Sequence, residues 1–260
     1  MPDNSEVMVM TRTMPGTSPD WTVTHSARIA EAARRAPRWG THEPWVLELH
    51  GRTVQLYEHV PLSRHHDIGA GRLLACGAAL TNIRLAVRTA GWLVETRFVC
   101  DRDRPDRVAE VTAGEILPPT LAEAHRFAAI LGRTRLAVSV GVPSPANVRA
   151  VVAASWCAGV ELRRLDAEPA GWALAAMGQS AVPGTEILLV LTVDDGRLDR
   201  VRAGAAIQSA CLAGSAVGVR VCPVAEPLWL PGVRANLIER CSLAGYPQAL
   251  LLIESPISHN

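Results

Sequence analysis

The chain contains no lysine, so each of its 26 basic side chains is an arginine. Basic and acidic side chains nearly balance, 26 against 25, and no block of like charge interrupts the sequence. Proteins that bind nucleic acid or an anionic membrane through charge carry a basic patch. We therefore expect neither partner. Any cationic side chain that binds a phosphate must be arginine or histidine.

Long apolar runs and paired cysteines are also missing. No apolar run reaches the ~20 residues that span a membrane, and the N-terminus lacks the basic-then-apolar pattern of a secretory signal. The six cysteines form no Cys-x-x-Cys pair, and most lie in apolar runs, as buried free thiols do. We expect a cytoplasmic protein whose residues 1–23 form a flexible N-terminal arm.

Several catalytic and metal-binding signatures are absent. The sequence has no Gly-x-Ser-x-Gly elbow, no Walker loop and no Gly-x-Gly-x-x-Gly after a strand. His65 and His66 are adjacent, so on a strand their side chains would face opposite ways, and no third cluster of ligands accompanies them. We expect a solvated loop there and no metal site.

One helix-length stretch occurs twice. Gly77-Ala-Ala-Leu aligns with Gly204-Ala-Ala-Ile, and Gly91 aligns with Gly218, at a constant offset of 127 residues. Each copy is rich in Ala and Leu and ends at a glycine, the usual residue just beyond a helix C-terminus. Two interpretations stay open: alanine-rich helices that resemble each other by composition, or two half-domains built on one plan.

Helices and strands are mixed along the 260 residues. Helices are expected over residues 27–36, 72–90, 120–131, 145–156, 198–217 and 232–241. Strands are expected over residues 46–49, 53–57, 93–99, 107–112, 160–165, 186–193, 219–222 and 249–254. This order predicts an α+β fold with two long central helices and sheets outside them. Residues 167–184 have no clear pattern.

Three segments stand out together: Gly71-Arg72 followed by Cys76–Leu80, Arg200–Gln208, and Gly245–Gln248 before an apolar strand. In this order they resemble the nitroreductase superfamily, in particular its actinobacterial Acg-like branch. The resemblance implies a nitroreductase-like fold in which two half-units are fused as an intramolecular pseudo-dimer. The halves would be residues 24–117 and a shortened second half, 118–260, with one FMN per chain in the cleft between them.

The resemblance also implies the residues that contact FMN. Ala36–Trp45 matches a flavin-binding loop of the family at both ends, which makes Arg38, Thr41, His42 and Glu43 candidates. Glu43 replaces an expected glutamine, and an ionised carboxylate only accepts hydrogen bonds. That change should weaken binding or raise the pKa of Glu43. An exposed loop with solvated charges is the alternative.

Two further segments complete the implied site. One resembles a phosphate-binding cluster, since guanidinium forks and a hydroxyl suit a phosphate dianion. The other resembles a loop whose backbone N–H meets flavin N5. The candidates are Arg133, Thr134 and Arg135 for the phosphate, and Pro223, Val224, Ala225 and Glu226 for the loop. Two surface arginines at a helix end are the alternative for the first segment.

The implied function is an oxidoreductase that passes reducing equivalents from NAD(P)H through FMN to a nitro, quinone or similar electrophilic acceptor. Such chemistry belongs to the cofactor, so no catalytic acid or base need appear in the chain. We expect a monomeric pseudo-dimer or a homodimer. The altered first loop and the short stretch between Asp166 and Ala175 leave an alternative open, a flavin-binding, storage or sensing protein without turnover.

Overall fold

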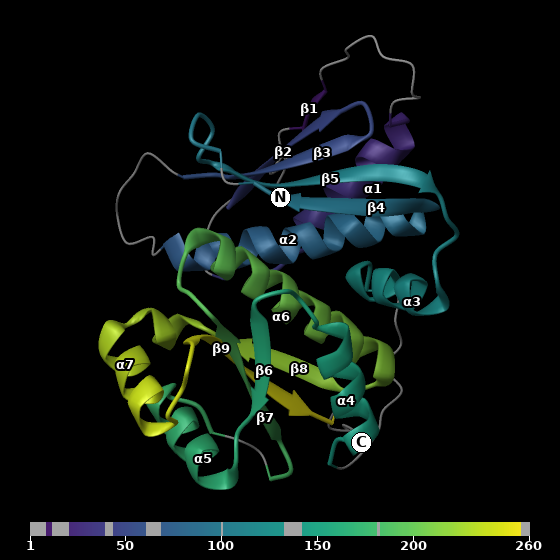
Figure 1. The fold of residues 1–260 in the computed structure, drawn as a ribbon. Coiled ribbons are helices and arrows are strands. Elements are labelled where there is room, and N and C mark those ends of the chain that lie inside the picture. Colours follow the sequence, from purple (N-terminus) through teal and green to yellow (C-terminus); the bar gives the residue numbers. More distant parts are fainter. Residues whose placement is uncertain are drawn as a thin grey trace, which may run out of the picture.

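Two long helices cross at the centre of the molecule, each with a sheet on its outer side (Figure 1). They are α2 (Gly69–Thr89) and α6 (Arg197–Val217). The computed structural model describes residues 9–11, 21–39, 44–60, 69–99, 101–132, 142–180 and 183–255. The predicted α+β class and the paired central helices are confirmed.

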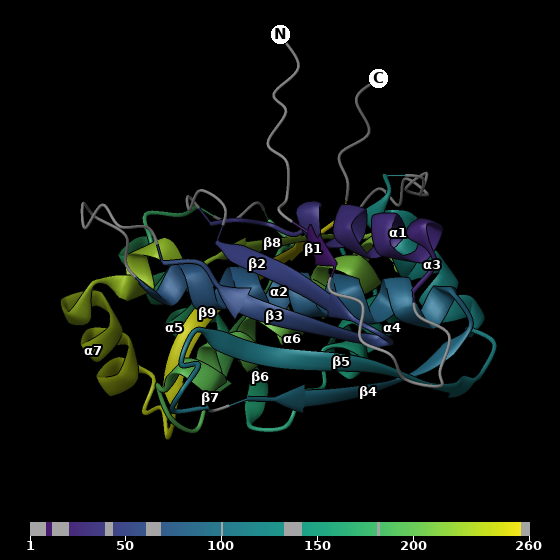
Figure 2. The ribbon, with the colours of Figure 1, turned by 90° about the horizontal axis from the view of Figure 1, so that it is seen from above.

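The first sheet has the strand order β1-β2-β3-β5-β4. Its strands are β1 (Val9–Thr11), β2 (Trp45–His50), β3 (Thr53–Glu58), β4 (Trp92–Phe98) and β5 (Arg107–Ile116). The sheet lies over α2, as the view from above shows (Figure 2). Helix α1 (Val23–Arg34) and helix α3 (Leu121–Ile130) pack beside it.

The second sheet has the order β6-β7-β9-β8. Its strands are β6 (Val160–Arg164), β7 (Glu186–Thr192), β8 (Arg220–Val224) and β9 (Tyr246–Glu254). The accompanying helices are α4 (Pro145–Ala154), α5 (Ala167–Ala176), the 3-10 helix η1 (Glu226–Trp229) and α7 (Pro231–Arg240).

The two halves share one topology. With β1 set aside, the order β2-β3-β5-β4 corresponds to β6-β7-β9-β8, and every pairing in both sets is antiparallel. The long helix follows the second of these strands in each half, and a shorter helix, α1 or α4, precedes the first. The correspondence covers whole half-units, so it favours duplication over a shared alanine-rich composition.

The helix crossing carries the same symmetry. A Cβ added to Gly77 would lie 2.0 Å from the carbonyl oxygen of Val201, and one added to Gly204 would lie 2.0 Å from that of Leu74. Positions 74 and 201 differ by the same 127 residues as positions 77 and 204. Reciprocal contacts of this kind define a two-fold interface. The repeated glycines therefore allow the two backbones to touch, as in a dimer made within one chain.

Buried polar side chains fix the register of this crossing. The Thr81 hydroxyl donates to the carbonyl of Ala205 at 3.0 Å, and the Gln208 amide donates to the Asn82 Oδ1 at 2.9 Å. Asn82 in turn donates to the carbonyl of Ala32. Because a buried polar group without a partner costs about 1–3 kcal/mol, sliding one helix along the other would be unfavourable.

Strand β7 is buried on both faces, as its continuous apolar sequence predicts. Leu188 and Val190 pack in the core between the sheet and α6. Leu189 and Leu191 pack on the opposite face with the α5 and α7 side chains. The second half therefore has two hydrophobic layers around one sheet.

Local signals set several element ends. Gly91 and Gly218 have φ values of 95° and 77°, the left-handed conformation expected of a glycine after a helix. Ser144 caps α4 and accepts from the N–H of Asn147, and Pro145 opens the helix. Thr120 forms a capping box with Glu123 at the start of α3.

Several elements differ from the predictions, of which three are informative. Helix α1 begins at Val23 rather than residue 27, because Thr22 is its cap and accepts from the N–H of His25. Residues 167–176, which the sequence left undefined, form α5. Strand β8 continues through Val224, two residues beyond its expected end.

The division into an arm and two halves stays a prediction. Within the expected arm, β1 pairs in parallel with β2. Phe127 and Ile130 of α3, which we assigned to the second half, pack in the core of the first. In the part of the chain that the structure covers, no helix is long and apolar enough to cross a membrane.

Candidate functional site

At the first turn of α2, one predicted flavin-binding segment meets the 3-10 helix that follows the other. A Cβ on Gly71 would lie 2.8 Å from the Trp229 ring and 3.4 Å from the carbonyl oxygen of Trp39. Trp39 follows Arg38 in the first loop, and Trp229 ends η1, which begins at Glu226. Segments from different halves thus converge on one glycine of a central helix.

Trp39 has an unusual backbone there. Its φ is 42°, a left-handed value that is uncommon for a residue other than glycine. Its side chain packs against the cores of both halves. Backbone strain held in place by surrounding structure is frequent at binding sites, so this residue marks the junction as a candidate.

One side-chain donor beside this turn and the backbone N–H groups at the start of η1 are candidates for contacts with a ligand. The indole N–H of Trp229 is buried and has no partner among the described residues. The N–H groups of Ala225 and Glu226 lie at the start of η1, where a 3-10 helix leaves its first donors without internal acceptors. Donors of this kind suit a ligand with several acceptor atoms along one edge, as a flavin has. The residues present therefore fit the implied cofactor.

An ionic cluster around the buried Glu58 carboxylate joins the two halves beside the same turn. Glu58, at the end of β3, has a side chain that is 1% exposed and accepts from Arg72 Nε at 2.9 Å. It also accepts from Arg197 of α6, which donates in addition to the carbonyl of Pro105. Arg72 belongs to the first half and Arg197 to the second. Glu58 therefore fixes the starts of both central helices relative to each other.

A second cluster organises the other half. Asp195, just before α6, accepts from Arg200, Arg234 and Gln248. Burial raises the pKa of Asp195, but these hydrogen bonds outweigh it and bring the pKa to about 2. Gln248 also donates to the Thr192 hydroxyl. The Gly245–Gln248 signature thus ties β9 to α6.

The structure describes some of the predicted site residues. Arg38 is half-buried, Ala225 is buried and Glu226 is exposed. Those outside the described residues are Thr41, His42, Glu43, Arg133, Thr134 and Arg135.

Pro223 and Val224 do not lie in a loop, which corrects our prediction. Both belong to β8, with Val224 opposite Leu250 of β9. Proline is accepted there because β8 is the edge strand of its sheet. The loop that could present backbone donors therefore begins at Ala225.

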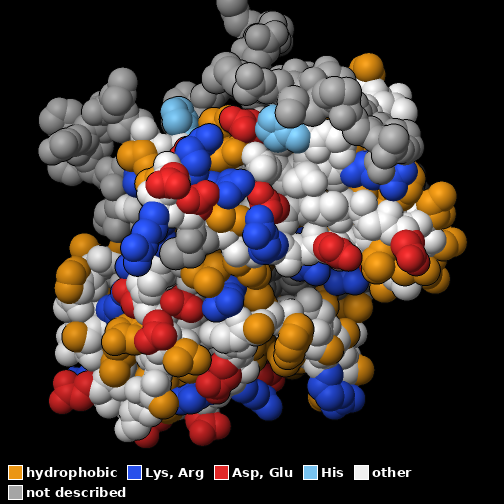
Figure 3. Space-filling view, turned by 45° about the horizontal axis from the view of Figure 1, so that its top comes forward, with side chains coloured by type: hydrophobic (Ala, Val, Ile, Leu, Met, Phe, Trp, Pro, Cys, Tyr) orange, Lys and Arg blue, Asp and Glu red, His pale blue; other side chains and the backbone are white. Residues whose placement is uncertain are grey.

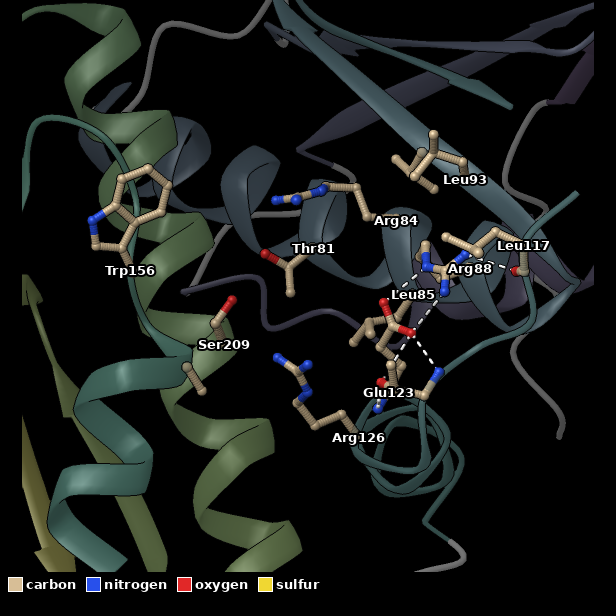
Figure 4. Close-up of a pocket in the computed structure, with 13 residues that line it drawn as sticks. Thr81, Arg84, Leu85, Arg88, Leu93, Leu117, Glu123, Arg126, Trp156 and Ser209 are labelled. Carbon is tan, nitrogen blue, oxygen red and sulfur yellow. Dashed lines mark hydrogen bonds and ion pairs between the residues drawn. The ribbon is translucent and has the colours of Figure 1, made fainter. Parts of the chain in front are cut away.

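A cavity of about 450 Å³ lies farther along the same helix pair, and the sequence did not point to it. Figure 4 shows arginines from α2 and α3 around it, with Trp156 at the far side. Arg84 and Arg88 are four residues apart in a helix that is otherwise mainly apolar. This spacing places both charges on one helix face, and it is the sequence feature that could have indicated the cavity.

Neither metal ligands nor reactive thiols stand out in the described ranges. No group of three or more His, Cys, Asp or Glu side chains there could hold a metal ion. The described cysteines are free thiols, as expected. Burial raises the pKa of Cys76 and brings that of Cys211 to about 12, so both stay protonated near neutral pH. His65 and His66 lie outside the described residues.

Charges of both signs are interspersed on the surface. Arginine and acidic side chains lie next to one another over the upper half of the face drawn in Figure 3. Their mixing agrees with the near-neutral composition of the chain.

Sequence comparison identifies relatives of the chain, although no family model matches it. It is 26% identical over 289 residues to the Mycobacterium tuberculosis protein named "Putative NAD(P)H nitroreductase Rv3131", a match that covers 86% of this chain and 83% of that protein. The chain is thus similar to a protein named as a nitroreductase. This similarity supports the resemblance to the nitroreductase superfamily that the three sequence segments indicated.

Shorter and weaker matches accompany it. "Uncharacterized protein Rv3127" of the same organism is 29% identical over 107 residues, 39% of this chain and 31% of that protein. Nitroreductase A from Vibrio parahaemolyticus matches 52% of this chain and 69% of its own, with 16% identity and a TM-score of 0.43. The hypothetical oxidoreductase YcnD from Bacillus subtilis matches with 18% identity and a TM-score of 0.40; the match covers 48% of this chain and 63% of the YcnD chain.

Proposed function

We propose that this chain is an FMN-binding, nitroreductase-like oxidoreductase that passes reducing equivalents from NAD(P)H to a nitro, quinone or similar electrophilic acceptor. The observation that carries the proposal is the convergence of Trp39 and Trp229 on Gly71. Trp39 belongs to the first of the two segments that the family resemblance assigns to the cofactor, and Trp229 lies three residues after the second.

Protein groups at this junction have distinct tasks. The indole N–H of Trp229 and the backbone N–H groups of Ala225 and Glu226 would donate to the acceptor edge of the flavin. Donors aimed at developing negative charge stabilise the reduced form. Arg38 would add positive charge on the side of the first loop. When bound, FMN would supply the hydride chemistry itself.

Two further sets of polar residues would hold the loops in place and bind the phosphate of FMN. Glu58, Arg72 and Arg197 hold the first turns of α2 and α6 together, so the two loops keep their spacing. Arg133, Thr134 and Arg135 are proposed to bind the FMN phosphate, because two guanidinium groups and a hydroxyl match its charge and acceptors.

A flavin-binding protein without turnover is the second candidate. One observation favours it: the Trp229 ring already packs directly against the Gly71 backbone. A ring held so tightly would restrict the approach of a second substrate to the flavin.

Anaerobic spectroscopy of the purified full chain separates these functions. We expect a yellow protein, or one that becomes yellow with added FMN, whose flavin absorbance is bleached by NADH or NADPH and restored by a quinone. Yellow protein that neither nucleotide bleaches would support the second candidate. Protein that stays colourless with excess FMN would overturn both.

The phosphate assignment has its own test. Replacing Arg133 and Arg135 with alanine should weaken FMN binding by about tenfold or more, since charge-assisted hydrogen bonds contribute roughly 1.5–3 kcal/mol each. Arg149→Ala, an exposed arginine of α4, is the matched control and should leave the affinity unchanged. Equal affinities in all three proteins would show that the phosphate lies elsewhere.

A further inference from the structure

The arginine-lined cavity is separate from the junction at the start of α2. Arg84 lies 13 residues after Gly71 in the same helix. At 1.5 Å per residue this places it about 20 Å along the helix axis. The cavity walls come from both halves, with α2 and β4 on one side and α4 and α6 on the other, while α3 closes one end (Figure 4).

One pair of charges in the cavity is already neutralised. Arg88 binds both carboxylate oxygens of Glu123, at 2.8 and 2.9 Å. It also donates to the carbonyls of Trp92, Leu117 and Pro118. The bonds to Arg88 hold the pKa of Glu123 at about 2. This pair forms a wall of the cavity and contributes no net charge.

Two other guanidinium groups in the cavity form no ion pair with any described carboxylate. Arg84 of α2 and Arg126 of α3 extend toward the same space (Figure 4). Neither has a carboxylate partner among the residues that the structure describes. Arg84 is exposed because it faces the open cavity, yet burial lowers the pKa of its guanidinium; Arg126 lowers this pKa further, while Cys157 and Glu123 partly oppose the shift. Two like charges held this way favour an anion between them.

An apolar rim surrounds these charges. Trp156 is 82% exposed, while Leu93 and Leu117 are 40% and 45% exposed. A tryptophan so exposed to solvent contributes little to the stability of the fold. A flat ligand ring stacked on Trp156 would bury the apolar surface of its indole. The hydroxyl of Ser209 on α6 lies in the same wall and offers one more hydrogen bond.

We propose that this cavity binds a phosphate monoester that carries a planar aromatic ring, as a nucleoside monophosphate does. Arg84 and Arg126 bind the phosphate, whose charge of about −1.5 to −2 at pH 7 matches the two cations. Trp156 stacks on the ring. A cavity of about 450 Å³ is within the usual range for small-molecule sites. The inference does not depend on flavin binding at the other junction.

Calorimetric titration of the full chain with AMP tests the proposal, with adenosine and inorganic phosphate as partial probes. We expect saturable binding of one AMP per chain and weaker binding of both fragments. Arg84→Gln and Arg126→Gln should each weaken AMP binding by about 10- to 100-fold, the effect of losing one charge-assisted hydrogen-bonding group. Trp156→Leu should weaken AMP and adenosine but leave inorganic phosphate unchanged.

Two controls make the result decisive. Arg149→Gln removes the same charge from an exposed position outside the cavity and should bind AMP like the wild type. The titration is repeated with saturating FMN, which should not displace AMP. Absence of saturable AMP binding, equal loss in Arg149→Gln, or full competition by FMN would each overturn the proposal of a separate site. None of these results tests whether the protein catalyses electron transfer through FMN.

Discussion

Replacing Gly204 with alanine tests the contact that joins the two halves. The new Cβ would lie 2.0 Å from the carbonyl oxygen of Leu74. Carbon and oxygen atoms approach no closer than about 3.3 Å, so the helices would have to separate by roughly 1.3 Å. Overpacking of this kind costs about 1–3 kcal/mol or more, and alanine recovers about 1 kcal/mol through its helix propensity. Because backbone atoms form the obstacle, we expect a net loss of about 2 kcal/mol.

Thermal and urea unfolding measure this loss. A change of about 2 kcal/mol should lower Tm by roughly 4–8 °C in a chain of this size. Gly77→Ala should cost a similar amount, because its Cβ would meet the Val201 carbonyl at the same distance. Gly171→Ala in α5 is the matched control: it has no atom within 4 Å and should stabilise the protein by about 0.5–1 kcal/mol. A Gly204→Ala protein as stable as the wild type would refute the close crossing.

Three further predictions concern charge and thiols. Glu58→Gln should destabilise the protein by about 3 kcal/mol in urea unfolding, since it leaves the Arg72 side of a buried ion pair uncompensated; a loss below ~1 kcal/mol would contradict this. Glu123 has a folded pKa of about 2 against an ordinary 4.5. Its contribution, about 3 kcal/mol above pH 5, should therefore disappear as the pH falls toward 2, and the stability gap between wild type and Glu123→Gln should close over that range. Cys76 and Cys211 should resist thiol labelling of the native protein at pH 7 and react only after unfolding, as mass spectrometry would show.

The repeated helix was the strongest structural information in the sequence. Its glycines predicted the C-terminal caps at Gly91 and Gly218, because a left-handed φ favours glycine whatever the tertiary context. The structure adds that Gly77 and Gly204 of the same repeat are where the two helices touch. It also shows the same order of four strands in each half.

Tertiary contacts explain what the sequence did not predict. Helix α5 forms because Ala173 and Leu174 bury themselves against the outer face of the second sheet, a partner that local pattern does not specify. Strand β8 extends through Val224 because β9 is available to pair with it. From the sequence alone Pro223 is expected in a loop, because a strand accepts proline mainly at the edge of a sheet, and the sequence does not show which strand lies there.

The candidate site was predictable only in part, for the same reason. The family resemblance placed two loops in the cofactor site, and the structure brings Trp39 and Trp229, which adjoin them, together. The arginine-lined cavity is assembled from α2, β4, α3, α4 and α6, and apart from the Arg84–Arg88 spacing no short motif contains its charged residues. Clusters built from distant segments become visible only after the helices are packed.

The number of FMN molecules bound per chain tests the central claim most directly. Only the first half offers a long loop after its first helix; the equivalent connection after α4 spans residues 155–159. Equilibrium titration of the full chain with FMN, followed by flavin fluorescence, should therefore saturate at one FMN per chain and weaken about tenfold or more in the Arg133→Ala, Arg135→Ala double variant. Saturation at two FMN per chain, or no binding, would contradict the account.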